Sequence, residues 1–343
     1  MTDIHKLVRE NVRILTPYSC ARDEFKGKEG VFMDANENPY GSLNRYPDPY
    51  QRELKSSIGR IKDIAEENIF LGNGSDEIID LCFRIFCNPG VDKALTFTPT
   101  YGMYEVSAAI NDVELIKVPL SKDFQIETER LFPFLKDPSL KLIFICSPNN
   151  PTGNLMKESA IKTILSSFRG IVVIDEAYID FTEKPSLIKL LSQHRNLIVM
   201  QTFSKAMGLA AARVGMAFMD SSAVGYFNKM KPPYNISTIN QKAALKSLAN
   251  IDLLKKRIRK IITERERLAE SLKKISIIEK IFPSDSNFLL VKTKDADFIY
   301  SELIDNKIIV RNRNKIVPGC IRITVGTPVE NDKLIRSLRE IKL

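Results

Sequence analysis

Residues 171–181 read IVVIDEAYIDF, in which four apolar residues run directly into two carboxylates. An uninterrupted apolar run of this kind predicts a β-strand that is buried on both faces of a sheet. Comparable runs occur at 94–97 (ALTF), 113–118 (VELIKV), 141–146 (KLIFIC), 197–200 (LIVM) and 214–218 (VGMAF). Segments with helical spacing, such as 75–87, separate several of them. The alternation predicts an α/β domain whose largely parallel sheet is covered by helices on both faces.

The remainder of the chain predicts a second, smaller α/β domain. The polar, proline-bearing stretch KPPYNIST at 231–238 indicates a boundary, and a long helix is expected over 240–275. Further apolar and helical segments follow at 288–292 (FLLVK), 295–306 (DADFIYSELIDN), 308–312 (IIVRN) and 320–326 (CIRITVG). We therefore expect a large domain at 30–237. Residues 238–343, together with an N-terminal arm at 1–29 that shows little periodicity, are expected to form the rest.

The composition of the 343 residues limits the function classes. The five cysteines contain no C-x-x-C, and His5 and His194 form no H-E-x-x-H, so we expect structural thiols and no metal site. The formal net charge of +9 would suit nucleic acid, but basic and acidic residues are interleaved, as at 254–274, which favours a solvated helix face. No apolar run approaches the ~20 residues that span a bilayer, and the N-terminus is too polar for a secretory signal. A cytoplasmic protein without nucleic-acid or membrane partners is expected.

Ligands in α/β folds bind beyond the carboxyl ends of the strands, where Asp175 and Glu176 follow the run 171–174. A nucleotide hydrolase would also need a G-x-x-x-x-G-K-[ST] loop, which the sequence lacks. Two interpretations remain for Asp175. It is a capping carboxylate without chemistry, or a buried carboxylate that pairs with a protonated ring nitrogen.

Two glycine-bearing turns offer further polar groups. In GNGSDE (72–77), small residues precede a helix whose first N–H groups and dipole favour a phosphate, although an ordinary glycine turn with a serine N-cap has the same appearance. In SPNNPTG (147–153), Asn149 and Asn150 can offer amide donors to a ligand, or simply belong to a stiff loop.

The stretch QTFSKAMGLAAARVGMAF at 201–218 contains one amine, Lys205, among small and apolar residues. Thr202, Ser204 and Arg213 can together hold a dianionic phosphate. Desolvation and nearby cations would lower the pKa of Lys205 and favour a nucleophilic amine. A surface lysine is the alternative. Taken together with Asp175 and the glycine turns, the set favours pyridoxal phosphate (PLP), which needs an amine, a phosphate site and a carboxylate for its ring nitrogen.

Nine motifs then occur in an order that resembles the fold-type-I PLP-dependent aminotransferases, and within them the histidinol-phosphate aminotransferases. They are TPYSCAR (16–22), MDANENPYG (33–41), NRYPDP (44–49), GNGSDE (72–77), PTYGMY (99–104), SPNNPTG (147–153), VIDEAYIDF (173–181), TFSKAMGLAAARVG (202–215) and CIRITVGT (320–327). The resemblance covers nearly the whole chain. It implies a large domain with a mostly parallel, mixed seven-stranded sheet between helices, and a smaller α/β C-terminal domain.

The resemblance also implies roles for the cofactor-binding residues. Lys205 would attach PLP covalently and act as general base, and Asp175 would hold the ring nitrogen protonated. Tyr178 and Asn150 would hydrogen-bond the ring hydroxyl, and Tyr101 would stack on the ring. The residues implied for the phosphate are Gly74, Ser75, Asp76, Thr202, Ser204, Arg213 and, from the neighbouring subunit of a homodimer, Tyr46.

For the substrate, the resemblance implies Arg322 and Arg311, with Arg313 able to replace the latter, and Tyr18 and Asn36 from the arm. The expected reaction converts L-histidinol phosphate and 2-oxoglutarate to imidazole-acetol phosphate and L-glutamate in histidine biosynthesis. An aromatic or broad-specificity aminotransferase and a phosphothreonine decarboxylase-like enzyme remain alternatives. A nucleic-acid-binding regulator with the same fold is disfavoured, since binding alone would not need the intact catalytic set.

Overall fold

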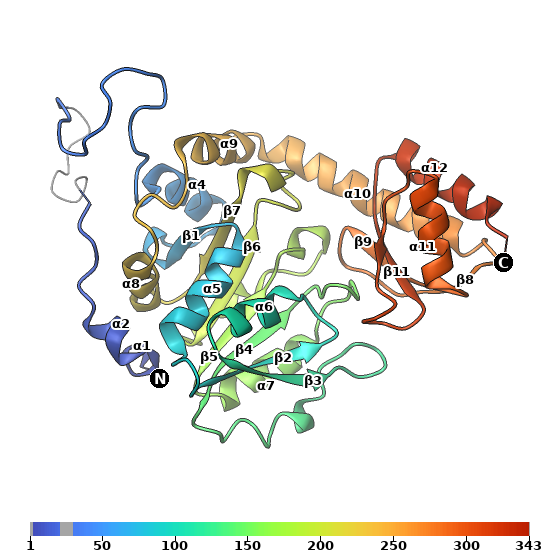
Figure 1. Cartoon of the computed structure of the whole chain (residues 1–343), viewed down its shortest axis with the longest axis horizontal. Coiled ribbons are helices and arrows are strands. Elements are labelled where there is room, and N and C mark those ends of the chain that lie inside the picture. The colour runs from blue at the N-terminus through green and yellow to red at the C-terminus, as the bar shows by residue number, and fades with distance from the viewer. Residues whose placement is uncertain (1–2, 21–29, 343) are drawn as a thin grey trace.

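The computed structural model describes residues 3–20 and 30–342 and contains two β-sheets (Figure 1). The larger sheet has seven strands in the order β1-β7-β6-β5-β4-β2-β3. Its strands are β1 (Ile69–Asn73), β2 (Lys93–Thr98), β3 (Glu114–Pro119), β4 (Leu140–Cys146), β5 (Ile171–Asp175), β6 (Leu197–Thr202) and β7 (Val214–Phe218). Only β7 runs against the others, being antiparallel to both β1 and β6. The predicted mostly parallel, mixed seven-stranded sheet is confirmed.

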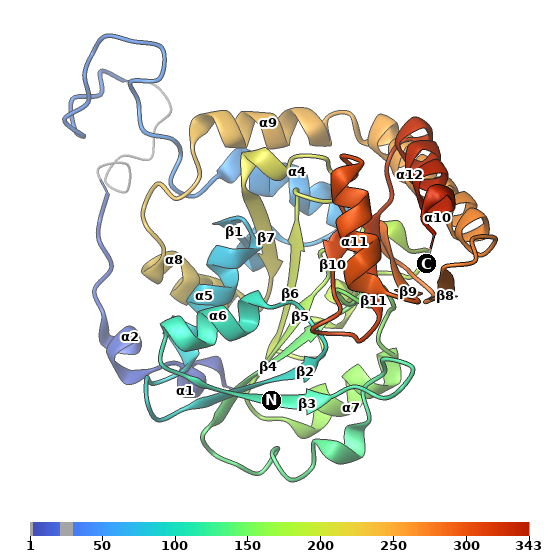
Figure 2. The same cartoon turned by 45° about the vertical axis from the view of Figure 1, so that its right-hand side comes forward.

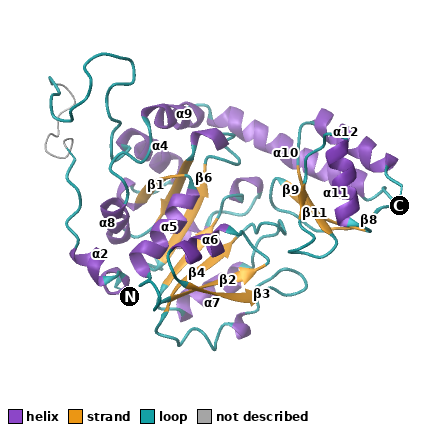
Figure 3. Cartoon of the chain, in the orientation of Figure 1, coloured by secondary structure: helices purple, strands orange, loops and turns teal. Residues whose placement is uncertain are grey.

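Helices cover both faces of this sheet because its central strands are apolar on both sides (Figure 3). Along β4, Ile143 and Ile145 face one helix layer, whereas Leu142 and Phe144 face the other. The helices of the first layer are α4 (Arg52–Lys62), α7 (Glu158–Ser167) and α9 (Thr238–Leu248). Those of the second are α5 (Ser75–Phe86), α6 (Met103–Ile110) and α8 (Ser221–Met230).

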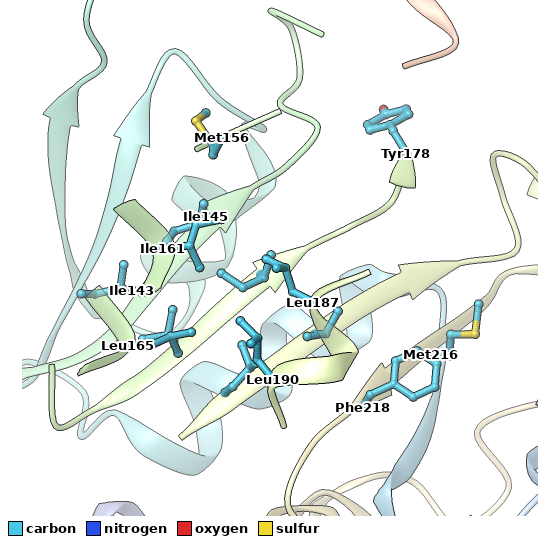
Figure 4. Close-up of a cluster of buried hydrophobic side chains, with 14 of the residues drawn as sticks. Ile143, Ile145, Met156, Ile161, Leu165, Tyr178, Leu187, Leu190, Met216 and Phe218 are labelled. Atoms are coloured by element: carbon cyan, nitrogen blue, oxygen red, sulfur yellow. The ribbon is translucent and has the colours of Figure 1, made fainter. Parts of the chain in front are cut away.

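Figure 4 shows part of the first layer, where Ile161 and Leu165 of α7 pack against Ile143 and Ile145. These side chains are almost fully buried. Truncating such a residue to alanine typically costs about 2–5 kcal/mol of stability. This packing fixes the strands whose carboxyl ends carry the polar motifs.

The smaller sheet is antiparallel, in the order β10-β11-β9-β8. Its strands are β8 (Ile278–Ile281), β9 (Phe288–Thr293), β10 (Arg311–Asn312) and β11 (Cys320–Thr324). The helices α10 (Ile251–Leu272), α11 (Ala296–Asp305) and α12 (Pro328–Glu340) cover one face, where Ile321 and Ile323 are buried. Since alternate residues of a strand point to opposite faces, Arg322 lies on the uncovered face. Its cross-strand neighbours there are Arg311 and Leu290.

The expected single helix over 240–275 is wrong, because the structure has α9 and α10 with Ala249 and Asn250 between them. Asn250 has non-helical dihedrals, and its side chain donates to the Lys246 carbonyl. Asparagine competes for backbone groups in this way and so favours helix ends. Together α9 and α10 lead from the large sheet to the small one (Figure 2).

The first residues of the chain are more ordered than an arm without periodicity. Two short helices, α1 (Ile4–Leu7) and α2 (Glu10–Ile14), bury Ile4 and Val12 against the α5 and α8 layer, and Val8 between the helices is buried there too. By contrast, the segment 30–47 extends away from the body (Figure 1). Ala21 and Arg22 of the TPYSCAR motif, and the end of the predicted arm, lie outside the described residues. The domain division at residues 30 and 238 stays a prediction.

The part of the chain that the structure describes also contains five short 3-10 helices: η1 (Glu66–Asn68), η2 (Thr128–Arg130), η3 (Ile179–Phe181), η4 (Leu187–Leu190) and η5 (Ala210–Ala212). All five cysteines are buried, and none of them forms a disulfide. Across residues 3–20 and 30–342, the helices are too short or too polar to cross a membrane.

Candidate active site

A cavity of about 410 Å³ lies between the carboxyl ends of β4, β5 and β6 and the β10–β11 hairpin of the small sheet. Most of the predicted site residues meet here. They are Ser75, Asp76, Tyr101, Asn150, Asp175, Tyr178, Thr202, Ser204, Lys205, Arg213, Arg311 and Arg322. Arg313, Cys146 and Ala177 also line the cavity. The two sheets thus contribute opposite walls of one site.

Lys205 lies in the turn after β6, with its Nζ 5.7 Å from the centroid of the Tyr178 ring. The residue is more exposed than the sequence predicted, because the cavity opens to solvent beside it. Its pKa is nevertheless lowered from the ordinary lysine value, first by desolvation of the amine and second by the positive charge of Arg322. Asp175 and Asp76 oppose this shift. A lysine in this setting is a better base and nucleophile near neutral pH.

Asp175 ends β5 and is 3% exposed. Its Oδ2 accepts a hydrogen bond of 2.8 Å from the Tyr104 hydroxyl, and its Oδ1 accepts one of 3.1 Å from the Ala177 N–H. Burial raises the pKa of this carboxyl, and the two donors counteract that effect. Asp175 therefore accepts from a backbone N–H of the local turn and also lines the cavity, and its pairing with a ring nitrogen stays a prediction.

The neighbouring carboxylate, Glu176, is turned away from Asp175 into the protein. It accepts hydrogen bonds from the Ser186 hydroxyl, the Leu187 N–H and the Gln201 amide. These bonds join the ends of β5 and β6 to η4. Glu176 is not among the residues that line this cavity. Its hydrogen bonds connect the segments that form the cavity walls.

At the start of α5, Gly74 is the N-cap with φ +77°, and Ser75 is the first helical residue instead of the serine N-cap that the sequence allowed. A Cβ at Gly74 would lie 2.5 Å from the Arg213 guanidinium, so only glycine permits this approach. Arg213 pairs with Asp76 at 3.1 Å, and Asp76 also accepts from the Tyr101 hydroxyl at 3.1 Å. Because no side chain caps α5, its first N–H groups can serve an anion.

The turn after β4 separates the two asparagines. Asn150 lines the cavity, and its carboxamide oxygen accepts a hydrogen bond from Arg322. Asn149 is fully buried, with its amide donating to the Pro99 carbonyl and the Thr152 hydroxyl. The possibility that Asn149 serves a ligand is therefore wrong, because its donors already stabilise the loop.

The small sheet contributes three guanidinium groups, those of Arg311, Arg313 and Arg322. Among the described residues none of the three forms an ion pair with a carboxylate, and the Nε atoms of Arg313 and Arg322 are buried without a hydrogen-bond partner. Burial, followed by repulsion from Arg322 and Arg311, lowers the pKa of Arg313 to about 10. Arg311 is exposed and Arg313 and Arg322 are half-buried, so the three guanidiniums bring positive charge to a cavity that solvent and ligands can reach, and this wall is suited to an anionic ligand.

Four predicted site residues are not among those that line the cavity of their own chain. Gly74 lies beside it at the N-cap of α5, against Arg213. Tyr18 is 76% exposed, Asn36 is exposed, and Tyr46, 51% exposed, stacks on Tyr234 with ring centroids 4.3 Å apart. Asn36 and Tyr46 instead line a separate hollow of about 450 Å³ beside the start of α9.

The sequence interpretation gave no site role to Cys146 and Ala177, which line the cavity, and it missed Tyr104, which contacts Asp175. Tyr104 belongs to the motif PTYGMY, but no role was assigned to it there. Its position three residues after Tyr101 would put both rings on one face of a helix, which is the only local signal. The hydrogen bond to Asp175 spans 71 positions in sequence.

The residues around the cavity fit PLP by their chemistry. The Lys205 amine lies beside the buried Asp175 carboxylate. The N-terminus of α5 has no side-chain cap and lies beside the Arg213 guanidinium, for which Gly74 leaves room. Within the described part of the chain, the two buried Nε atoms have no partner and could serve a further anion. A cofactor with an aldehyde, a basic ring nitrogen and a phosphate matches the first set group by group.

Comparisons with known proteins agree with this chemistry. The family described as aminotransferase class I and II matches residues 29–338. The chain is 50% identical to a histidinol-phosphate aminotransferase of Cytophaga hutchinsonii over 98% of both chains. It is 49% identical to that of Parabacteroides distasonis over 100% of both.

Solved structures show the same fold. A histidinol-phosphate aminotransferase from Clostridium acetobutylicum has a TM-score of 0.80 at 25% identity, over 87% of this chain and 90% of that one. The enzyme from Sinorhizobium meliloti in complex with pyridoxal-5'-phosphate has a TM-score of 0.78 at 25% identity, over 87% and 83%. The predicted fold-type-I architecture and the PLP cofactor are confirmed. The chain belongs to the class I and II aminotransferases and, within them, to the histidinol-phosphate aminotransferase family.

Proposed function

We propose that this protein transfers an amino group between L-histidinol phosphate and 2-oxoglutarate, giving imidazole-acetol phosphate and L-glutamate. The observation that carries the proposal is that two walls with different chemical groups face the same cavity. A lysine amine and a buried carboxylate lie on one side, and three guanidiniums that form no ion pair within residues 3–20 and 30–342 lie on the other. The names of relatives that are 43–50% identical support the same substrate.

In this proposal the large-sheet wall holds PLP. Lys205 would bind the aldehyde carbon, and Asp175 would accept from the ring nitrogen. The first turn of α5 with Thr202, Ser204 and Arg213 would hold the phosphate, and Tyr101 would lie against the ring. Tyr178 and Asn150 would reach the ring hydroxyl. When bound, PLP supplies an electron sink for the carbon that gains or loses a proton.

The residues of the chain supply the proton transfer. The amine of Lys205, displaced by the incoming substrate amine, would take the proton from the substrate carbon that carries nitrogen and deliver it again on the same face. A base works best when its pKa lies near the working pH, and the lowered pKa of Lys205 moves it in that direction. Asp175 would stay ionised to hold the opposite charge on the ring nitrogen in place.

The arginine wall would bind the substrate anion in both half-reactions. One half-reaction presents a phosphate and the other a side-chain carboxylate, and guanidinium groups bind both through paired N–H donors. Arg322 is already oriented by Asn150 and by the Phe288 ring, whose centroid lies 5.0 Å from its Cζ.

We also propose that the enzyme works as a homodimer in the cytoplasm. Tyr46, Asn36 and Tyr18 are exposed and lie outside the cavity of their own chain, which supports a role in the site of a neighbouring copy. In that arrangement Tyr46 would reach the cofactor phosphate, and Tyr18 and Asn36 would contact the substrate.

The test compares two acceptors in single turnovers. Enzyme loaded with pyridoxamine phosphate is mixed with imidazole-acetol phosphate or with phenylpyruvate, and the absorbance change is followed. A much faster reaction with the phosphorylated acceptor is expected, because only it brings a dianion to the arginine wall. Equal rates would indicate an aromatic or broad-specificity aminotransferase. Release of carbon dioxide from phosphothreonine would indicate a decarboxylase.

A further inference from the structure

We infer that Tyr104 is a positioning residue for the cofactor: its hydroxyl keeps Asp175 ionised and oriented toward the cavity. This inference rests on the proposed function, because it assigns to Asp175 the partner of a protonated ring nitrogen. The direct observation is the 2.8 Å hydrogen bond from the Tyr104 hydroxyl to Asp175 Oδ2.

The Tyr104 hydroxyl lies in apolar surroundings, where a polar group needs a specific partner. The residue lies on α6 with no exposed surface, its ring stacked on Phe144 with centroids 5.0 Å apart. The ring of Tyr101 meets it edge-on at 5.7 Å. Phenylalanine would fill this apolar space equally well, and a buried hydroxyl is tolerated only with a partner. That partner is a carboxylate at the end of a strand in the cavity wall.

The hydrogen bond has a defined effect on Asp175. Among the described residues the carboxylate has one donor on each oxygen, Tyr104 on Oδ2 and the Ala177 N–H on Oδ1. Donors to a carboxylate favour its ionised form, whereas burial and the nearby charge of Asp76 favour the neutral form. With both oxygens held, the plane of the carboxylate is fixed.

The other titratable groups around Asp175 do not replace Tyr104. Lys205 favours the ionised form only through its charge, and the Cys146 thiol on the adjacent strand has its pKa raised by burial. Tyr178 is also buried, and desolvation raises its pKa. Tyr104 is therefore the one side-chain hydroxyl in the described structure that donates directly to this carboxylate.

An ionised carboxylate stabilises the protonated form of a ring nitrogen beside it. If the Tyr104 hydroxyl is removed, Asp175 gains proton affinity, and the proton shared with the ring nitrogen moves toward the carboxylate. The expected result is weaker cofactor binding and a weaker electron sink, while the packing of the aromatic cluster remains.

The experiment uses Tyr104→Phe, with Tyr226→Phe as the matched control. Tyr226, on α8, is also buried and does not line the cavity. Its hydroxyl forms a 2.7 Å hydrogen bond with His5 Nδ1. Two cofactor readouts are measured on full-length protein. One is the affinity of the PLP-free protein for PLP as a function of pH, and the other is the ¹⁵N chemical shift of ring-labelled PLP.

For Tyr104→Phe we expect PLP affinity at neutral pH to fall about tenfold, the size expected for one hydrogen bond to a charged group. The acid-side loss of affinity should begin at higher pH, and the ¹⁵N shift should move toward that of an unprotonated ring. Turnover should fall more than KM rises. Tyr226→Phe should change none of these.

A second variant tests the opposite sign and guards against misfolding of the first. With 3-fluorotyrosine at position 104, the hydroxyl is a stronger donor, so the acid-side loss should begin at lower pH than in the unmodified protein. An unchanged ¹⁵N shift and an unchanged pH dependence in both variants would overturn the inference, even if activity were lost. A protonated ring in an enzyme inactive on histidinol phosphate would instead overturn the proposed function and leave Tyr104 its role.

Discussion

The two walls of the cavity differ in how completely their polar groups are satisfied. On the large-sheet wall, Asp175 has a donor on each carboxylate oxygen, and Arg213 is paired with Asp76. On the small-sheet wall, the Nε atoms of Arg313 and Arg322 are buried without partners, and Arg311 has no ion pair among the described residues. A prearranged wall suits a ligand that stays, whereas a wall with uncompensated charge suits anions that exchange.

The largest expected effect separates covalent chemistry from binding. Lys205→Ala should lower turnover by about a thousandfold, because it removes the base and the attachment point. Borohydride reduction of the wild type should fix PLP to the peptide that carries Lys205.

Lys55 is the matched control for this prediction. It is buried and does not line the cavity, and burial followed by the charge of Lys231 lowers its pKa to about 8. Because Lys55 has a low pKa but does not line the cavity, it should form no adduct with PLP. A PLP adduct fixed to Lys55 by borohydride would contradict the assignment of Lys205. Lys55→Met should leave the labelling of Lys205 unchanged.

The next effect concerns the small-sheet wall alone. Arg322→Gln should lower kcat/KM for both histidinol phosphate and glutamate by about 10- to 100-fold, the range expected when a charged hydrogen-bonding group is removed. Affinity for PLP should stay near the wild-type value. Arg257→Gln, an exposed change on α10, should alter neither quantity. If PLP binding fell as much as substrate use, the division between the walls would not hold.

A smaller effect concerns the prearranged wall. Gly74→Ala should destabilise the PLP-free protein by about 1–3 kcal/mol, since its dihedrals suit glycine alone and the Cβ would press on Arg213. Urea unfolding would measure this, and PLP titration should show weaker binding. Gly225→Ala in α8 has open space for its Cβ and should stabilise by about 0.5–1 kcal/mol. Normal PLP affinity in Gly74→Ala would argue against a phosphate site there.

The smallest expected effect is a change in the pKa of Lys205, to which charged groups on both walls contribute. Only neutral Lys205 reacts with an aldehyde, so the reaction rate of the PLP-free protein should rise with pH, with a midpoint below that of ordinary lysine. Arg322→Gln removes a charge that disfavours the ammonium, so it should raise this pKa and move the midpoint upward.

The rate is measured with a small neutral aldehyde, trapping with cyanoborohydride and peptide mass spectrometry. Peptides with exposed lysines provide the internal reference. A midpoint that moves downward in Arg322→Gln would show that the two walls are not electrostatically coupled in the stated direction.

Much of the fold could be predicted because its central strands are apolar on both faces. The runs that end at Cys146 and Asp175 become β4 and β5 with little change in their bounds. Strand β8 was missed because its sequence, IEKI, is half polar and lies at a sheet edge. The break at Asn250 depends on one side chain that bonds the Lys246 carbonyl, which helical periodicity does not register.

The candidate site was predictable to a different extent in its two walls. Lys205 and Asp175 directly follow predicted strands, which places them at one edge of the sheet, whereas Gly74 was assigned from its glycine turn before a helix. Tyr104 was missed because its significance depends on a partner that only the packing of α6 on β4 and β5 brings close. Tyr46 could not be placed from one chain, since its predicted contact belongs to another copy.

The five residues of strand β11 contribute to two parts of the molecule, the core of the small domain and the cavity. Ile321 and Ile323 fill the core of the small domain, and Arg322 between them faces the cavity. Because the period of a strand is two residues, an insertion or deletion of one residue here would bury the charge and expose both isoleucines. Selection for folding and selection for substrate thus act on the same register. Evolution can alter specificity by exchanging the side chain at 322, but not by sliding the strand that presents it.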